Sequence, residues 1–191
     1  MTIQENEIIK KIKEKKELSG LSDSIILESL KTYLKKNSIS LNGLKKQDTR
    51  IIVKDIRSEL RFLSGQYQKG IKNRSQLLTE NDINKVLNTH SSTSERLPYY
   101  SMIKEKIKEL KIKSILDLGC GLNPIALASS KEYYYAFDIK EDEIALISEY
   151  FNDNNIQGEV SIYDLRKINN DLPKTDLCII FKVLDVVDDK H

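Results

Sequence analysis

The chain has 191 residues, which gives room for one domain or for one compact domain with an appendage. Hydrophobic residues make up 39% of it and charged residues 31%, a composition typical of globular rather than fibrous or low-complexity proteins. No apolar run approaches the roughly 20 residues of a membrane span, and no signal-peptide core is present, so we expect a cytoplasmic protein. Two cysteines and two histidines exclude a disulfide framework and argue against any zinc cluster.

The net charge of +2 hides a strong polarity along the chain. Residues 1–113 carry 24 Lys and Arg against 14 Asp and Glu, whereas residues 114–191 carry 7 against 15. This asymmetry predicts a basic surface for a polyanion, joined to a more acidic binding or catalytic unit. The alternative, in which the lysine-rich helices are only solvated surfaces, stays open at this point.

The N-terminal part has helical periodicity throughout. Ile8, Ile9 and Ile12 form the apolar stripe of a first helical segment that ends near Leu18. Side chains suited to begin three further helices are Ser22, Asp48, and Thr79 with its capping-box partner Asp82. Because no segment alternates with period two, we predict an all-helical subdomain over residues 1–88.

The pattern changes after one more amphipathic helix over residues 98–110, on which Tyr99, Ile103, Ile107 and Leu110 share a face. Short apolar runs follow at 114–118, 133–139, 160–163 and 177–183, with helical segments after the first two. Buried strands that alternate with helices are typical of a parallel α/β sheet. We therefore predict an α/β domain over residues 89–191 with about four parallel strands.

The most informative segment is SILDLGCGLNP, residues 114–124. Gly119 and Gly121 let the backbone turn tightly after a strand and approach a ligand closely. Asn123 is suited to be the N-cap of the next helix and Pro124 its first residue. A dinucleotide-binding loop would need a third glycine at position 124, and no Lys-Ser/Thr follows, so pyrophosphate-binding and phosphate-binding loops are excluded.

A strand, a DxGxG loop and a helix, with an acid at the end of the next strand, are instead typical of S-adenosylmethionine-dependent methyltransferases. Asp138 is that acid, and we expect it to accept hydrogen bonds from both ribose hydroxyls. Asp164 ends the third strand, where it would face the adenine amine while Leu165 packs on the ring. The alternative is that Asp117, Asp138 and Asp164 are ordinary strand-end residues.

Two segments together resemble one family. HSSTSERLPYY (90–100) followed by LDLGCGLNP (116–124) is similar to the bacterial aminoglycoside-resistance methyltransferases, which methylate N7 of a guanine in the decoding site of 16S rRNA. The family residues present in register are His90, Ser92, Thr93, Glu95, Arg96 and Leu97, with the complete glycine loop. The resemblance implies a Rossmann-like class I methyltransferase fold and S-adenosyl-L-methionine as cofactor.

The resemblance also implies roles for individual residues. Arg96 would bind the methionine carboxylate, for which a bidentate guanidinium is well suited. With the strand-end acids, the expected cofactor-binding residues are His90, Ser91, Ser92, Arg96, Asp117, Gly119, Gly121, Asp138, Ile139, Asp164, Leu165 and Ile180. Lys182 resembles a family lysine near cofactor and substrate, and it is our candidate for orienting the guanine. We assign no other catalytic residue, because guanine N7 attacks a methyl group without losing a proton.

The family carries a basic N-terminal extension that docks on the small ribosomal subunit, so we expect 16S rRNA in the 30S subunit as partner. The expected RNA-binding residues are Lys10, Lys11, Lys45, Lys46, Arg50, Arg57 and Arg61, with Lys13, Lys15 and Lys16 as further candidates for phosphate contacts. We expect a monomer without a metal ion.

The sequence departs from the family in one respect. A complete methyltransferase sheet has seven strands, and here the pattern ends after the fourth, so we expect a chain truncated at its C-terminus. Two alternatives remain at this stage: a methyltransferase of another RNA or of a small molecule, or an RNA-binding remnant without catalysis.

Overall fold

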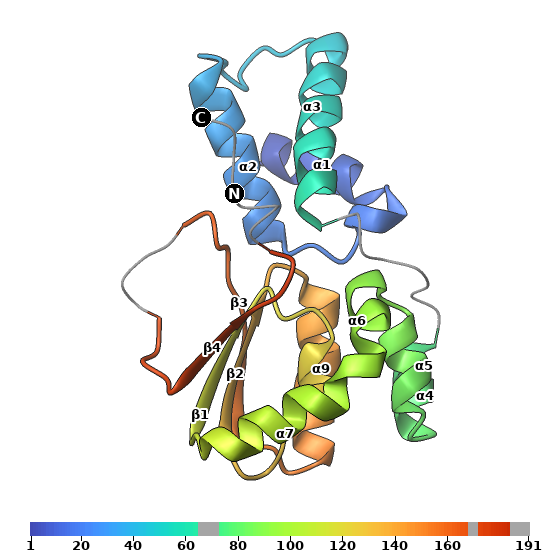
Figure 1. Cartoon of the computed structure of the whole chain (residues 1–191). Helices are drawn as coiled ribbons and strands as arrows, with labels where there is room; N and C mark the ends of the chain where they lie inside the picture. The colour runs from blue at the N-terminus through green and yellow to red at the C-terminus, as the bar shows by residue number, and fades with distance from the viewer. Residues whose placement is uncertain (65–72, 168–171, 184–191) are drawn as a thin grey trace. The chain divides into compact units, whose positions relative to one another are not determined.

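The structure, a computed structural model, describes residues 1–64, 73–167 and 172–183 (Figure 1). Contacts within the chain divide it into two compact units, Met1–Gln66 and Tyr67–His191. Each unit has its own core and is described separately below.

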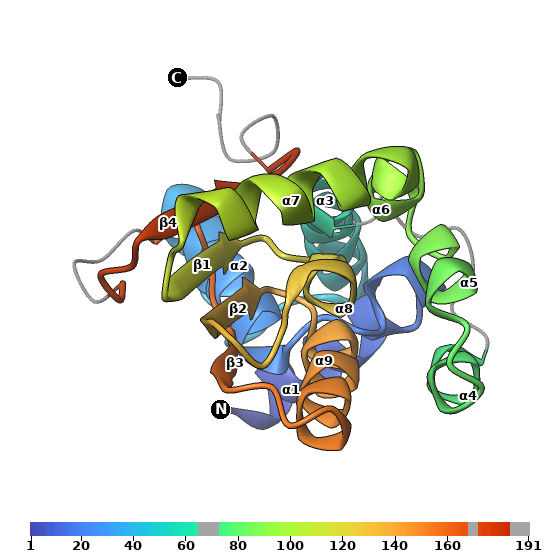
Figure 2. The same ribbon diagram turned by 60° about the horizontal axis from the view of Figure 1, so that its bottom comes forward.

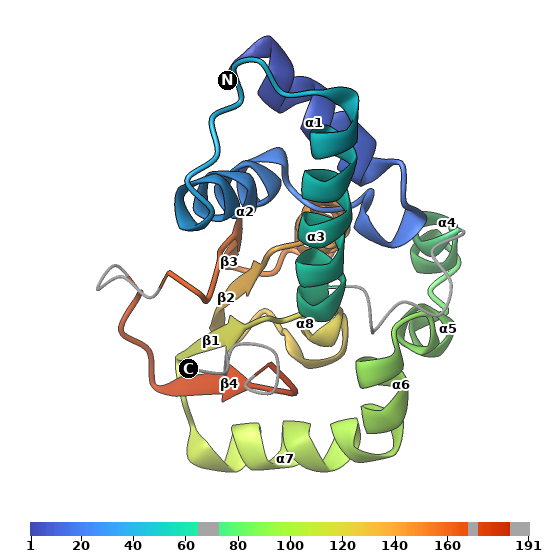
Figure 3. The same cartoon turned by 90° about the horizontal axis from the view of Figure 1, so that it is seen from above.

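The first unit consists of helices, as the periodicity predicts. It contains α1 (Ile3–Lys13), the 3-10 turn η1 (Lys16–Leu18), α2 (Asp23–Lys36) and α3 (Lys46–Ser64), which Figure 3 shows from above. Each helix buries one apolar stripe against the others. The core residues are Ile8, Ile9, Ile12, Leu18, Leu21, Ile25, Ile26, Leu30, Ile52, Val53, Ile56 and Leu60.

The helix starts of this unit agree with the sequence in part. The Ser22 hydroxyl accepts a hydrogen bond from the backbone N–H of Ser24, so Ser22 caps α2 as predicted. Asp48 does not cap α3. It lies in the first turn of that helix, and its carboxylate accepts a hydrogen bond of 3.1 Å from the backbone N–H of Lys45.

The second unit is built on a four-stranded sheet. Its strands are β1 (Ser114–Leu118), β2 (Tyr133–Asp138), β3 (Gly158–Ile162) and β4 (Leu177–Ile180). They are all parallel and lie in the order β3-β2-β1-β4, which can be followed in Figure 3. The parallel α/β sheet of the sequence analysis is confirmed, although β4 ends three residues before the predicted end.

Seven helical segments accompany this sheet in the described part of the second unit. They are α4 (Arg74–Thr79), α5 (Ile83–Asn88), α6 (Ser91–Arg96), η2 (Leu97–Tyr99), α7 (Tyr100–Leu110), α8 (Asn123–Leu127) and α9 (Glu141–Asp153). Apolar residues of α5, α7, α8 and α9 pack on one face of the sheet in a single core, and Figure 2 shows the last three of these helices there.

Helices α4 and α5 belong to the second unit, so the division lies between Gln66 and Tyr67 rather than after residue 88. The physical reason is that Val86 and Leu87 are buried in the core on the sheet. The capping box expected at Thr79 is wrong, because Thr79 is the last residue of α4. Asp82 caps α5 by itself, accepting from the backbone N–H of Lys85 at 3.2 Å.

The buried face of α7 differs from the predicted one by one position at its start. Tyr100 and Ile107 are buried, while Tyr99 and Leu110 are 55% and 62% exposed. The α-helix also begins at Tyr100 rather than at residue 98, and Leu110 at its end lies off the buried face. No helix in the described ranges of the chain has the length and apolar character needed to cross a membrane.

The other face of the sheet carries a smaller apolar cluster. Leu116, Leu118 and Phe137 are buried there, and Tyr163 stacks on Phe137 with ring centroids 5.6 Å apart. Leu165 packs against the same cluster just after β3. This cluster lines the ends of β1 and β2 on the side opposite to the helices.

Candidate functional site

The candidate site lies at the carboxyl ends of the parallel strands, where the loop after β1 turns back over the sheet. Gly119 and Gly121 adopt left-handed conformations, with φ of +64° and +49°. The backbone N–H groups of Gly119 and Cys120 both donate to the carbonyl of Phe137, at 2.8 and 3.0 Å. A Cβ at position 119 would overlap Val183, so this turn needs glycine for its conformation and for its close packing.

Asp138, at the end of β2, joins this loop directly. Its carboxylate accepts hydrogen bonds from the backbone N–H of Gly121 at 2.9 Å and of Lys140 at 3.1 Å. Burial raises the pKa of Asp138 to about 6, and the charge of Glu143 adds to the rise, while the two N–H groups and Lys140 oppose it. The carboxylate is therefore ionised at neutral pH and fixed against the glycine loop.

His90 lies on the other side of Gly121. It precedes α6, is buried, and has imidazole atoms 3.3 Å from the position that a Cβ of residue 121 would take. Burial lowers the pKa of His90, and nearby Arg74, Lys140 and Arg96 lower it further, although Glu143 acts in the opposite direction. The imidazole is therefore neutral at pH 7 and packs against the glycine loop.

Arg96 and Asn123 connect α6 to the start of α8. The Asn123 side-chain oxygen accepts from Arg96 Nη2 at 3.0 Å and from the hydroxyl of Tyr100 at 2.7 Å. Asn123 is not the N-cap that we predicted: it is the first residue of α8, and the cap position is Leu122. The guanidinium of Arg96 also lies over the ring of Phe181, 4.9 Å from its centroid.

Asp117 is fully buried beneath this group. Its carboxylate accepts a hydrogen bond of 2.8 Å from the hydroxyl of Tyr134. Burial raises the pKa of Asp117 to about 7, against the hydrogen bond from Tyr134 and the nearby Asn123 amide and Arg96 charge. Burying a carboxyl in the core costs folding free energy, and such strongly shifted pKa values are typical of functional sites.

Three buried polar atoms around this point lack a hydrogen-bond partner within the described residues. They are Arg96 Nε, Asp117 Oδ1 and Asn123 Nδ2. Buried polar atoms are nearly always paired in folded proteins. The Asn123 amide is close enough to Asp117 to lower its pKa, so these two groups can pair with each other, whereas Arg96 Nε is left as a buried donor for a polar ligand.

Of the remaining predicted cofactor residues, Ile139, Asp164 and Ile180 lie at strand ends, whereas Ser91 and Ser92 lie at the start of α6. Asp164 follows β3 and is held by Arg166, whose Nη2 lies 2.7 Å from its carboxylate. Burial alone would raise the pKa of Asp164, but the hydrogen bonds and charge of Arg166 outweigh burial and lower it. Ser92 is buried and Ser91 and Ile139 are half-buried, whereas Ile180, paired in register with Leu118, is 40% exposed.

The model of the family described as ribosomal RNA methyltransferase (FmrO) matches residues 76–191, which is more than half of the chain. The chain belongs to this family. The matched residues include His90, Arg96, Gly121 and Asp138, and this membership confirms the family that residues 90–124 predict.

Curated relatives agree with the family. The chain is 29% identical over 111 residues to the 16S rRNA (guanine(1405)-N(7))-methyltransferase of Proteus mirabilis, covering 54% of this chain and 40% of that protein. It is 25% identical over 114 residues to the enzyme of the same name from Frankia casuarinae, covering 56% and 39%. The aligned segments thus span about two fifths of the length of these relatives.

A solved structure of similar fold is the 16S rRNA methylase RmtB, with a TM-score of 0.75 and 22% identity over 98% of this chain and 75% of that chain. The 16S rRNA methyltransferase RmtF, solved in complex with S-adenosyl-L-homocysteine, has a TM-score of 0.74 and 20% identity over 98% and 72%. At these identities the likeness concerns the fold, which confirms the predicted α/β class.

In this member of the FmrO family, Lys182 forms an ion pair within the second unit. It lies two residues beyond β4 with φ of +56°, and its ammonium forms an ion pair with Glu95 of α6. Together with the stacking of Arg96 on Phe181, this pair ties the segment after β4 to α6. The role of Lys182 in orienting a guanine stays a prediction.

The predicted RNA-binding residues of the first unit fall into two groups. Lys10, Lys11, Lys45, Lys46 and Arg50 are exposed. By contrast, Arg57 donates to the carbonyl of Lys11 and pairs with Glu14 at 3.2 Å, and Arg61 pairs with Glu17 at 2.7 Å. The two arginines therefore join α3 to α1 and η1, and RNA binding by all seven residues stays a prediction.

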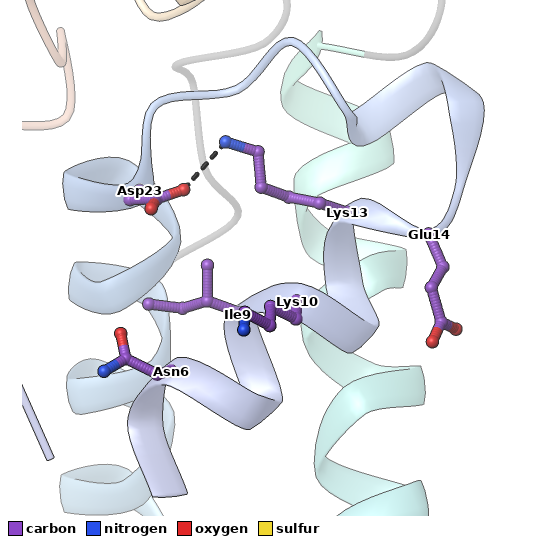
Figure 4. A pocket seen from close by; sticks show the side chains of 6 residues that line it. All are labelled: Asn6, Ile9, Lys10, Lys13, Glu14 and Asp23. Carbon is purple, nitrogen blue, oxygen red and sulfur yellow. Dashed lines mark hydrogen bonds and ion pairs between the residues drawn. The ribbon is translucent and has the colours of Figure 1, made fainter. Parts of the chain in front are cut away.

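A shallow pocket in the first unit lies beside two of the candidate lysines. It has a volume of about 390 Å³ and is lined by Asn6, Ile9, Lys10, Lys13, Glu14 and Asp23 (Figure 4). Lys13 pairs with Asp23 across it at 2.7 Å. Because Lys13 already has a carboxylate partner, it is a weaker candidate for a phosphate contact than Lys10.

Sequence reasoning missed several residues of the site. Tyr100 lies within the family segment 90–100, but no local pattern marks its hydrogen bond with Asn123, which is 23 positions away. Arg74 and Glu143 carry no local signal either, since their contact joins residues 69 positions apart. Within the described ranges, no group of three or more His, Cys, Asp or Glu is arranged to hold a metal ion.

Proposed function

We propose that the chain is an S-adenosyl-L-methionine-dependent methyltransferase that acts on N7 of a guanine in the decoding site of 16S rRNA. The observation that carries this proposal is the group of Arg96, Gly121 and Asp138 around one strand-end loop in a chain of the rRNA methyltransferase family. The names of the curated relatives support the target, and the S-adenosyl-L-homocysteine complex of RmtF supports the cofactor.

The residues present fit this cofactor. Arg96 Nε is a buried donor in need of an acceptor, and the methionine carboxylate is such an acceptor. Asp138 has lone pairs beyond those used by two backbone N–H groups, so it can also accept ribose hydroxyls. Asp117 Oδ1 offers an acceptor for the α-amino group. Asp164 and Leu165 remain our candidates for the adenine.

When bound, the cofactor supplies an electrophilic methyl group on a sulfonium centre. Guanine N7 carries an exposed lone pair, so the reaction needs no residue that removes a proton. The task of the chain is therefore to hold N7 in line with the methyl group and to exclude water. The target base must leave its stack, at a cost of a few kcal/mol that contacts to the RNA backbone offset.

The exposed lysines and Arg50 of the first unit support docking on the 30S subunit, because exposed cations neutralise phosphates and release counterions. We further propose that the chain acts as a monomer in the cytoplasm, where the ribosome is. Methylation of the decoding site would confer aminoglycoside resistance, and this consequence is part of the proposal.

The direct test is transfer of tritiated methyl groups from S-adenosyl-L-methionine to purified 30S subunits, with primer extension to locate the modified base. We expect label in one decoding-site guanine, and none with Asp138→Ala. The matched control is Glu149→Ala, an exposed acid of α9, which should transfer label like the wild type. Labelled small molecules with unmodified RNA would support a metabolite enzyme, and no transfer to any acceptor would support a remnant.

A further inference from the structure

A buried ion pair joins the second unit together next to the glycine loop. Arg74, at the start of α4, and Glu143, in the first turn of α9, are only 6% and 1% exposed, with Nη1 and Oε1 3.2 Å apart. The same guanidinium donates from Nε to the Thr89 hydroxyl at 2.7 Å and from Nη2 to the Thr89 carbonyl at 3.3 Å. One side chain thus holds both α9 and the turn that leads into His90.

This ion pair borders Gly121. A Cβ at position 121 would lie 3.8 Å from Glu143 Oε2 and 3.3 Å from the imidazole of His90. The N–H of Gly121 donates to Asp138. Two carboxylates, those of Glu143 and Asp138, therefore lie next to one glycine. Like charges in the protein interior repel strongly unless a cation balances them.

We propose that Arg74 is a positioning residue for the cofactor site, because it partly balances the charge of Glu143 and so lets Asp138 stay ionised against the glycine loop. The inference rests on the proposed function, in which Asp138 binds the ribose. It gives Arg74 a role in cofactor affinity, although this residue lies on α4, outside the glycine loop and the segment 90–100. The charge of Glu143 contributes to the raised pKa of Asp138, which is in line with this geometry.

The charged and titratable groups near the two carboxylates come from several elements. The charge of Lys140, after β2, lowers the pKa of Asp138, and the charges of Asp138 and Asp117 of β1 repel each other. Arg74 pairs with Glu143, and the charge of Glu143 raises the pKa of His90. Cys120 of the glycine loop faces both carboxylates, and burial keeps its pKa well above the ordinary value. These groups are common to every variant below, so differences between variants report on Arg74 and Glu143.

The test is calorimetric titration of S-adenosyl-L-homocysteine between pH 5.5 and 8.5, with circular dichroism to verify folding. Wild-type affinity should weaken as Asp138 protonates near pH 6. Arg74→Gln should move this midpoint up by about one pH unit, because Glu143 then repels the Asp138 carboxylate. At pH 6.5 its affinity should fall by about threefold.

Two further variants separate positioning from folding. Arg74→Gln combined with Glu143→Gln removes both charges and should bring the midpoint down to that of the wild type or below it. Thr89→Val removes the hydroxyl that accepts from Arg74 Nε but keeps the Thr89 carbonyl and the ion pair, so it should leave the midpoint unchanged. If Arg74→Gln does not fold, Arg74→Lys replaces it and should keep the wild-type midpoint.

The inference is overturned if Arg74→Gln has the wild-type pH profile, if the double variant keeps the shifted midpoint, or if Arg74→Lys shifts it upward. A wild-type chain that gives no heat of binding at any pH would instead contradict the proposed function. The two failures are therefore distinguishable in one set of titrations.

Discussion

Asp117 shows at the level of a single residue how the site differs from an ordinary core. It is fully buried, and its carboxylate accepts a hydrogen bond from the Tyr134 hydroxyl. Burial raises its pKa to about 7. An apolar side chain at this position would pack without any desolvation cost. The carboxyl is therefore best explained by the ligand that its unpartnered oxygen would meet.

The raised pKa of Asp117 predicts a pH-dependent stability. The folded chain holds the proton more tightly than the unfolded chain, so the stabilising contribution is complete below about pH 4 and is lost as the pH rises to about 7. Asp117→Asn is neutral throughout and accepts the Tyr134 hydrogen bond. In urea unfolding, its stability relative to the wild type should rise by a few kcal/mol from pH 5 to pH 8.

Measuring the difference between variant and wild type cancels the other titrating groups. A difference that stays constant between pH 5 and pH 8 would show that Asp117 does not carry this linkage. The same variant should bind S-adenosyl-L-homocysteine more weakly, so stability and binding should change in opposite directions at pH 8.

At the level of elements, local patterns predict the frame of the site and long-range contacts complete it. The strand Ser114–Leu118, the glycine turn and Asp138 at the end of β2 all follow from residue types within a few positions of one another. The engagement of Asn123 by Arg96 does not, because the side-chain oxygen that would cap α8 is used by an element 27 residues away. Local propensity gives the start of a helix, and tertiary contacts decide what its first side chains bind.

The first turn of α4 and the segment after β4 illustrate the same limit. Arg74 resembles any surface arginine of a lysine-rich chain, and only the folded structure shows it buried against Glu143. Lys182 stays our candidate for orienting the guanine, and its ion pair with Glu95 could not be predicted, because it depends on where α6 lies relative to the end of β4. Contacts over such sequence separations leave no periodic signal in a single sequence.

Gly43 of the first unit is a matched control for Gly121 in the turn after β1, because the two separate the effect of backbone conformation from the effect of close packing. Gly43 and Gly121 both have positive φ, of +80° and +49°, but a Cβ on Gly43 meets nothing within 4 Å, whereas one on Gly121 meets His90. Each Gly→Ala change should cost about 1–2 kcal/mol of left-handed strain. Only Gly121→Ala should also weaken S-adenosyl-L-homocysteine binding, by about tenfold, or 1.4 kcal/mol.

Calorimetry and thermal unfolding of the two variants would measure both effects. Equal losses of affinity in Gly43→Ala and Gly121→Ala would contradict the assignment of the loop to the site. An unchanged affinity in Gly121→Ala would do the same.

At the level of the whole molecule, the chain combines a basic helical unit with an α/β unit that carries the candidate cofactor site. Five predicted RNA contacts of the first unit are exposed, whereas Arg57 and Arg61 hold helices together. If those five bind phosphates, the logarithm of the 30S affinity should fall against the logarithm of salt concentration with a slope of about 4.

Removing two of these cations provides the measurement. Lys45→Ala with Lys46→Ala should lower the slope by about 2, because each phosphate contact contributes about one unit. Lys111→Ala with Lys113→Ala, two exposed lysines of the second unit, should leave it unchanged. Equal slopes for the two pairs would argue against docking through the first unit.

The measurement closest to the central claim is titration of the wild-type chain with S-adenosyl-L-homocysteine at pH 7.5, beside Arg96→Ala and Asp138→Ala. We predict saturable binding with one site per chain, strongly weakened in both variants, because each removes a group that the strand-end loop presents to the ligand. The absence of binding to the wild type, or equal affinity in all three proteins, would contradict the account.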